Sequence, residues 1–185
     1  AGISVGREVV FDPGPGGWVT IDGWSYTGRI TVRAEFGRLS VVETVAADDY
    51  LAGLREMPAS WPTEALKAQA VAARTYLAHT MAGAGDRRWD ICATTSCQVY
   101  RGPVGADRRW VDAIAVTAGE ILLYEGGPAQ ALYSASAGTS TVASSEVWGG
   151  APVPYLQPVS SPERGVSPWT EWSVRVAADA VVRML

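Results

Sequence analysis

The chain has 185 residues, of which 48% are hydrophobic and 18% are charged, a composition typical of one globular domain and unlike a disordered, collagen-like or coiled-coil chain. Fifteen basic and nineteen acidic residues give a net charge of -4, so we do not expect a nucleic-acid-binding surface, which needs a basic stripe. No apolar run approaches the ~18 to 20 residues of a membrane span.

The N-terminal part predicts short antiparallel strands separated by turns. Runs at 28–34 and 39–45 alternate in the way that half-buried strands do, and Gly- and Pro-containing turns interrupt the segment that precedes them. We therefore expect a single domain that begins with a β-rich lobe over residues 1–46 and continues with a core over residues 47–185.

Two helices are predicted after this lobe. Asp48 is a suitable N-cap for a short helix that Pro58 must end, which places Glu56 at its C-terminal edge. Pro62 at a first helical position, followed by small or apolar residues at helical spacing, predicts an alanine-rich helix of about twenty residues that Gly83 ends.

The second half of the chain predicts mixed elements. Residues 107–118 fit a helix, and residues 121–133 fit a hairpin-like pair of strands with the turn at 125–128. The stretch 134–168 is rich in Ser, Thr, Gly and Pro, as functional loops often are. A final strand over Trp172–Val176 and a helix over 177–185 complete an α+β fold with a mixed, β-containing C-terminal half.

Glu56 is the first candidate for chemistry. A carboxyl group at a helix C-terminus meets the negative end of the helix dipole, and Leu54 and Met57 would partly exclude water from it. Both effects disfavour the charged form, which is how a carboxylic acid is kept protonated so that it can donate a proton to a leaving group. The alternative is a solvated glutamate paired with Arg55 or Arg88.

Cys92 and Cys97, the only two cysteines, allow three arrangements: a short-loop disulfide, two reduced buried thiols, or part of a metal site. Structural zinc uses four Cys or His ligands, and His79 is the single histidine. This ligand count argues against zinc, and we expect no metal and no cofactor. A serine nucleophile would also depend on His79, so we favour binding or turn-forming roles for the hydroxyl groups of Ser134 and Ser136.

Several segments occur in an order that characterises one family. The segment Tyr50–Pro62, which contains Glu56-Met57-Pro58, is followed directly by Glu64–Tyr76, and later segments lie at 97–102, 115–119, 133–138 and 146–150. Together, over roughly residues 25 to 175, they resemble the SpoIID/LytB family, the bacterial stage II sporulation protein D and amidase enhancer group.

The resemblance implies a lytic transglycosylase in which Glu56 protonates the glycosidic oxygen between N-acetylmuramic acid and N-acetylglucosamine. The same carboxylate then acts as a base while the muramoyl C6 hydroxyl closes a 1,6-anhydro ring, so no second carboxylate is needed. The resemblance also implies that residues 47–185 are the catalytic core, built around a glycan-binding cleft. It supplies candidates for substrate contacts, namely Gln98, Tyr133, Ser134 and Ser136, with Lys67 as a further candidate.

The expected partner is the glycan strand of peptidoglycan, outside the cytoplasm, and the amidase-enhancer relatives suggest a cell-wall amidase as a second partner. The main alternative is a non-catalytic wall-binding module that enhances such an amidase. Another is an ordinary hydrolase that uses Glu56 with Glu146 or Asp90 as a second carboxylate. The chain also departs from the family pattern: Ser96 stands where many relatives have a histidine, which strengthens the disulfide or free-thiol interpretation, and Gly138-Thr139 replaces a pair of glycines.

Overall fold

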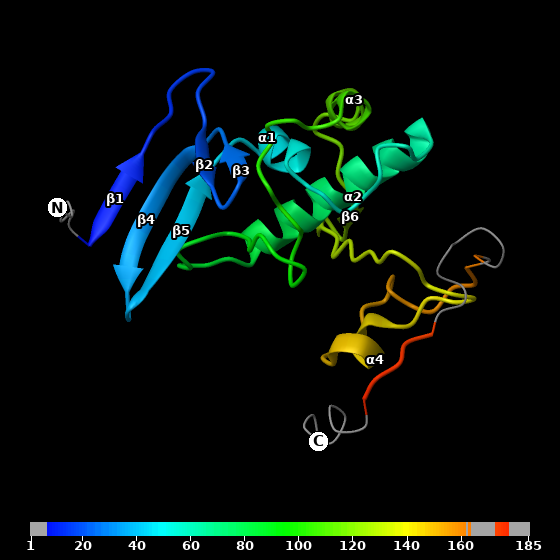
Figure 1. The fold of residues 1–185 in the computed structure, drawn as a ribbon. Coiled ribbons are helices and arrows are strands. Elements are labelled where there is room, and N and C mark those ends of the chain that lie inside the picture. The colour runs from blue at the N-terminus through cyan, green and yellow to red at the C-terminus, as the bar shows by residue number, and fades with distance from the viewer. Residues whose placement is uncertain (1–6, 162, 164–172, 178–185) are drawn as a thin grey trace. The chain divides into compact units, whose positions relative to one another are not determined.

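The computed structural model describes residues 7–161, 163 and 173–177. The chain falls into two compact units, Ala1–Leu132 and Tyr133–Leu185, and each is described by itself (Figure 1). Helices and strands both occur, which confirms the α+β class. The division at residue 46 and the glycan-binding cleft stay predictions.

The first unit contains β1 (Glu8–Phe11), β2 (Val19–Ile21), β3 (Trp24–Tyr26), β4 (Arg29–Glu35), β5 (Arg38–Thr44), α1 (Ala47–Ala52), α2 (Thr63–Ala82), α3 (Arg108–Val116), β6 (Leu123–Tyr124) and β7 (Gly127–Pro128).

The predicted N-terminal strands are confirmed, but their connection is not a simple meander. β1, β4 and β5 form an antiparallel sheet in the order β1-β4-β5, while β2 and β3 form a separate hairpin between β1 and β4 in the sequence. Each hairpin turns through two residues with positive φ, namely Asp22-Gly23, Phe36-Gly37 and Glu125-Gly126. Such turns match the twist of the strands that they join.

The first helix begins and ends earlier than predicted. α1 starts after Ala46, so Asp48 lies in its first turn and is not its N-cap, and Gly53 caps its C-terminal end. A Cβ atom on Gly53 would lie 2.1 Å from Cε2 of Tyr100, so the absence of a side chain lets the chain leave the helix against that ring. Glu56 therefore lies beyond the helix, and the prediction that places it at the helix edge is wrong.

The long helix is confirmed. α2 begins after Pro62 and ends at Gly83, and its buried side chains form one stripe that packs against α1 and α3. Three members of this stripe, Leu66, Ala70 and Ala73, are completely buried. The alanines leave room for close approach of the neighbouring helices, which places the main core of the first unit around α2. No described helix is both long and apolar enough to cross a membrane.

Arg74 links α2 to the end of α3. Its guanidinium group donates hydrogen bonds to the carbonyl oxygens of Ile114, Thr117 and Glu120 at 3.1, 2.8 and 3.2 Å, and it lies 3.6 Å from a carboxylate oxygen of Asp48. A helix leaves its last carbonyl groups without partners inside the helix. The buried cation of α2 therefore supplies the donors that α3 lacks at its C-terminal end.

The predicted hairpin after α3 is shorter than expected. β7 occupies Gly127–Pro128, where the sequence analysis placed the turn, because the turn itself needs only two residues. In the second unit, the described residues contain α4 (Ser144–Trp148) and an isolated bridge between Ser140 and Ser160. Residues 173–177 have no regular secondary structure, which contradicts the predicted strand there. The predicted helix over 177–185 lies outside the described residues, except for Ala177.

Candidate functional site

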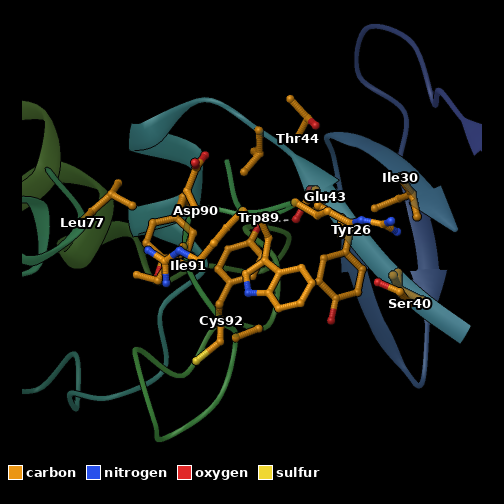
Figure 2. Close-up of a pocket in the computed structure, with 18 of the residues that line it drawn as sticks. Tyr26, Ile30, Ser40, Glu43, Thr44, Leu77, Trp89, Asp90, Ile91 and Cys92 are labelled. Carbon is orange, nitrogen blue, oxygen red and sulfur yellow. Dashed lines mark hydrogen bonds between the residues drawn. The ribbon is translucent and has the colours of Figure 1, made fainter. Parts of the chain in front are cut away.

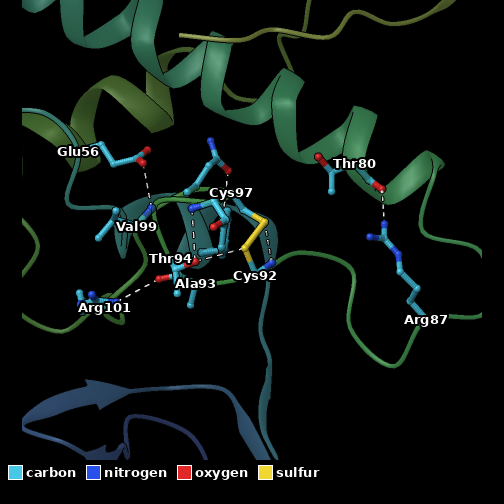
Figure 3. Close-up of a disulfide and its surroundings, with 12 residues drawn as sticks. Glu56, Thr80, Arg87, Cys92, Ala93, Thr94, Cys97, Val99 and Arg101 are labelled. Carbon is cyan, nitrogen blue, oxygen red and sulfur yellow. Dashed lines mark hydrogen bonds between the residues drawn. A yellow bond between two sulfur atoms is a disulfide. The ribbon is translucent and has the colours of Figure 1, made fainter. Parts of the chain in front are cut away.

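Glu56 lies at the end of a two-stranded pairing between residues 53–56 and residues 98–101. Leu54 and Tyr100 form an antiparallel bridge, and the amide of Arg55 donates to the Val99 carbonyl oxygen at 2.9 Å. The Val99 amide then donates to Oε1 of Glu56, also at 2.9 Å (Figure 3). The backbone of the paired strand therefore helps to orient this partly buried carboxyl group.

Two arginines hold the segment that carries Glu56. The Arg55 guanidinium donates to the carbonyl oxygens of Ala52, Leu54 and Gly102 at 2.9 to 3.0 Å, and burial lowers its pKa. From α3, Arg109 donates to the carbonyl oxygen of Ala59, and to that of Trp61 at 2.8 Å. The chain is thus fixed on both sides of Glu56.

The structure joins Cys92 and Cys97 by a disulfide, which closes a loop directly before the strand that pairs with the Glu56 segment (Figure 3). Inside this loop the Cys97 amide donates to the Thr94 carbonyl oxygen at 2.9 Å, and the Cys92 amide contacts the Cys97 sulfur at 3.3 Å. The disulfide therefore anchors the chain just before Val99, the residue whose amide holds Glu56.

Gln98 and Lys67 occupy very different environments. Gln98 is fully buried; its Oε1 accepts a hydrogen bond from the Tyr50 hydroxyl at 2.9 Å, and its Nε2 donates to the Ala73 carbonyl oxygen at 3.3 Å. These bonds hold the strand of Gln98 against α1 and α2, so its side chain does not present a surface to a ligand here. Lys67, on α2, is partly exposed and pairs with Glu64 at 2.7 Å.

Tyr133, Ser134 and Ser136 lie at the start of the second unit, so they are described apart from Glu56. The Ser136 hydroxyl and the Ala137 amide both donate to the Glu163 carboxylate, at 2.5 and 2.7 Å. These hydrogen bonds, that of Ser136 above all, lower the pKa of Glu163. Ser134 is exposed, and its hydroxyl donates to the Ser136 carbonyl oxygen at 3.3 Å.

Sequence reasoning missed several residues that order these segments. Arg109 and Glu163 are each far in sequence from the residues that they hold, and no local pattern marks them. Tyr100 lies in the family-like segment at 97–102, and its hydroxyl donates to a carboxylate oxygen of Glu43 at 2.6 Å, a contact that no local pattern indicates. The sequence contains one signal for the role of Arg109. This residue stands in the first turn of a predicted helix, where a positive charge is unfavourable unless nearby oxygen atoms accept hydrogen bonds from it.

Comparison with known proteins places most of the first unit in one family. Residues 35–124 match the family model described as SpoIID, stage II sporulation protein. The matched segment includes Glu56, Lys67, Gln98 and both cysteines, whereas Tyr133, Ser134 and Ser136 follow it.

Curated relatives agree with this match. An uncharacterized protein of Brachyspira hyodysenteriae is 36% identical over 167 residues, which cover 88% of this chain and 45% of that protein. The amidase enhancer of Bacillus subtilis is 46% identical over 101 residues, covering 55% of this chain and 13% of that protein. Stage II sporulation protein D of B. subtilis is 33% identical over 144 residues, which cover 69% of this chain and 42% of that protein. The chain thus spans less than half the length of each of these relatives.

Proposed function

Because this chain belongs to the SpoIID family, we propose that it is a lytic transglycosylase that cleaves the glycan strands of peptidoglycan with Glu56 as its acid and base. The observation that carries the proposal is the fixed carboxyl group of Glu56, held by the Val99 amide inside the segment that matches the family. The names of the relatives, a sporulation protein and an amidase enhancer, support a role at the cell wall.

In the proposed reaction the protonated Glu56 donates its proton to the glycosidic oxygen as the bond from C1 of N-acetylmuramic acid to that oxygen breaks. The C6 hydroxyl of the same sugar attacks C1, and its proton passes to the Glu56 carboxylate, which restores the acid. The products are an N-acetylglucosamine with a free 4-hydroxyl and a 1,6-anhydro-N-acetylmuramic acid. Water is not consumed, since the substrate supplies its own nucleophile.

The hydrogen bond from the Val99 amide has a specific role in this scheme. By donating to Oε1, the Val99 amide restrains the rotation of the carboxyl group and so helps to hold it in place for both proton transfers. The arginine contacts to residues 52, 54, 59 and 61 keep the segment from shifting during the two proton transfers. A carboxyl group held in one position can donate its proton to the glycosidic oxygen and then accept the proton of the C6 hydroxyl.

The test is Glu56→Gln on purified glycan strands, with mass spectrometry of the soluble products. We expect release of anhydro sugars to fall by about 100-fold or more, the usual effect of removing a general acid. Glu64→Gln is the matched control, because Glu64 is an exposed glutamate close by in sequence that pairs only with Lys67 among the described residues. Unchanged product release by Glu56→Gln would show that the catalytic assignment is wrong.

A second candidate function is a non-catalytic module that binds the wall and enhances an amidase. The 46% identity to the amidase enhancer over 101 residues favours it. Sedimentation with wall sacculi that survives Glu56→Gln, together with no soluble sugar from the wild type, would select this function. Reducing-end products without the anhydro ring would instead select hydrolysis with Asp90 or Glu146 as the second carboxylate.

We further propose that the protein acts outside the cytoplasm. The Cys92–Cys97 disulfide supports this location, since structural disulfides persist mainly in oxidising compartments. The peptidoglycan substrate of the proposed reaction lies there as well, and a cell-wall amidase would be met in the same place.

A further inference from the structure

A groove of about 690 Å³ lies between the sheet and the helical part of the first unit (Figure 2). Residues of β5, the start of α1, the end of α2 and the loop 86–93 line it, and Glu56 is not among the lining residues. The volume falls within the ~300 to 1,000 Å³ that is usual for ligand sites. The groove is therefore a candidate binding site separate from the proposed acid.

Four aromatic side chains line this groove. Tyr50 and Tyr100 stack with their ring centroids 4.9 Å apart, and Tyr26 is tilted against Tyr100 at 6.0 Å. Trp89 comes from the loop, lies beside Tyr26 in the close-up, and keeps 47% of its surface exposed (Figure 2). The indole of Trp89 thus offers a flat apolar face that water covers in the absence of a ligand.

One carboxylate in the groove is already occupied. Glu43 accepts hydrogen bonds from the Gly28 amide at 2.8 Å and from the Tyr100 hydroxyl at 2.6 Å. Burial, followed by the hydrogen bond to Glu43, raises the pKa of Tyr100, so its hydroxyl remains a donor at any physiological pH. Both oxygens of Glu43 are therefore used by the protein.

The groove contains charged side chains of both signs. Arg88 pairs with Glu35, and Arg87 donates to the carbonyl oxygens of Ala84 and Thr80. In the described part of the chain, by contrast, no hydrogen bond or ion pair involves the exposed carboxylate of Asp90, which lines the groove next to Trp89. The Asp90 carboxylate is therefore available to accept hydrogen bonds from a ligand with hydroxyl donors.

We propose that this groove is a saccharide subsite, in which a pyranose ring stacks on Trp89 and its hydroxyl groups donate to the Asp90 carboxylate. A sugar ring has an apolar face bounded by hydroxyl groups, which complements an exposed indole and a free carboxylate that line the same groove. The choice of an N-acetylhexosamine as the sugar rests on the proposed function. The subsite itself does not depend on catalysis, because Glu56 lies outside the groove.

The experiment measures binding of a tetramer of N-acetylglucosamine to the full chain by titration calorimetry. We expect Trp89→Ala to weaken binding about tenfold, the loss that corresponds to one aromatic stacking contact. Asp90→Asn, which keeps the shape of the side chain, should weaken binding about threefold to tenfold. Trp18→Ala is the matched control, since Trp18 is an exposed tryptophan (59%) that does not line the groove, and it should leave the affinity unchanged.

Several outcomes would overturn this inference. The first is that Trp89→Ala binds the tetramer as tightly as the wild type does. The second is that Trp18→Ala loses as much affinity as Trp89→Ala. The third is that a peptide from the wall displaces the sugar. If circular dichroism shows that Trp89→Ala is unfolded, Asp90→Asn decides the question.

Glu56→Gln separates the inference from the proposed function. Binding that Glu56→Gln abolishes and Trp89→Ala preserves would place the sugar at Glu56 and contradict the subsite alone. Binding that Glu56→Gln preserves and Trp89→Ala abolishes, in a protein that releases no anhydro sugar, would support the subsite and contradict the proposed catalysis.

Discussion

Tyr100 is the residue whose ionisation should govern stability at high pH. Its pKa is raised in the folded protein, whereas an unfolded tyrosine titrates near pH ~10. Above that pH the unfolded chain loses a proton that the native protein keeps, so the free energy of unfolding falls as the pH rises. For one proton the expected slope is about 1.4 kcal/mol per pH unit, with no loss from this group below pH ~10.

Urea unfolding at pH 9 and pH 11 tests this prediction. Tyr100→Phe removes the hydrogen bond to Glu43 and should be less stable at pH 9, but it should lose less further stability between the two pH values than the wild type does. Tyr155→Phe, in the second unit, should keep the wild-type difference. Equal pH dependence in wild type and Tyr100→Phe would contradict the assignment.

At the scale of single residues, the sequence indicates which residue is the candidate acid better than it indicates the surroundings of that residue in the fold. Glu56 was singled out by its neighbours and its family-like motif, but its position after a helix end was predicted wrongly, because only the fold reveals that Gly53 packs on Tyr100. Gln98 lies in the expected segment, and its burial depends on Tyr50 and Ala73, which are distant in sequence. Such long-range contacts are absent from any local pattern.

At the scale of elements, the contact between α2 and α3 depends on the geometry of an arginine. We predict that Arg74→Lys lowers the free energy of unfolding by about 2 to 4 kcal/mol, because a lysine cannot reach three carbonyl groups with a planar fork and leaves buried acceptors unpaired. Arg88→Lys is the control, since Arg88 forms a surface pair with Glu35 and should change stability by less than about 1 kcal/mol. Denaturant unfolding measures both, and a loss under about 0.5 kcal/mol for Arg74→Lys would contradict this role.

Elements with strong local signals were predicted well. α2 has Pro before it, Gly after it and a buried stripe at helical spacing, and its bounds differ little from those expected. The N-terminal strands were also predicted, whereas the order β1-β4-β5 was not, since pairing between β1 and β4 depends on tertiary packing. In the hairpin after α3, strand β7 falls within the predicted turn, because two residues with positive φ, Glu125 and Gly126, are enough to reverse the chain.

At the scale of the whole molecule, the two units differ in how much they bury. The main hydrophobic cluster is formed by buried residues between positions 50 and 114 of the first unit, while in the described part of the second unit Ala143 is the buried hydrophobic residue. Hydrogen exchange followed by mass spectrometry should therefore find the slowest amides in α2 and α3, and amides of α4 should exchange through openings of lower free energy. Equal protection of α2 and α4 would contradict this expectation.

The pairing of residues 53–56 with 98–101 also constrains the order of folding. Glu56 and the amide that orients it are 43 residues apart, with the whole of α2 and the disulfide loop between them. Contacts of such sequence separation carry a large loop-closure entropy and form after local helices. A nascent chain can therefore contain Glu56 and a complete α2 helix before Val99 has been synthesised, and in that state the proposed acid would exist without its orientation. Assembly of the site is for this reason a late event in the biogenesis of the protein.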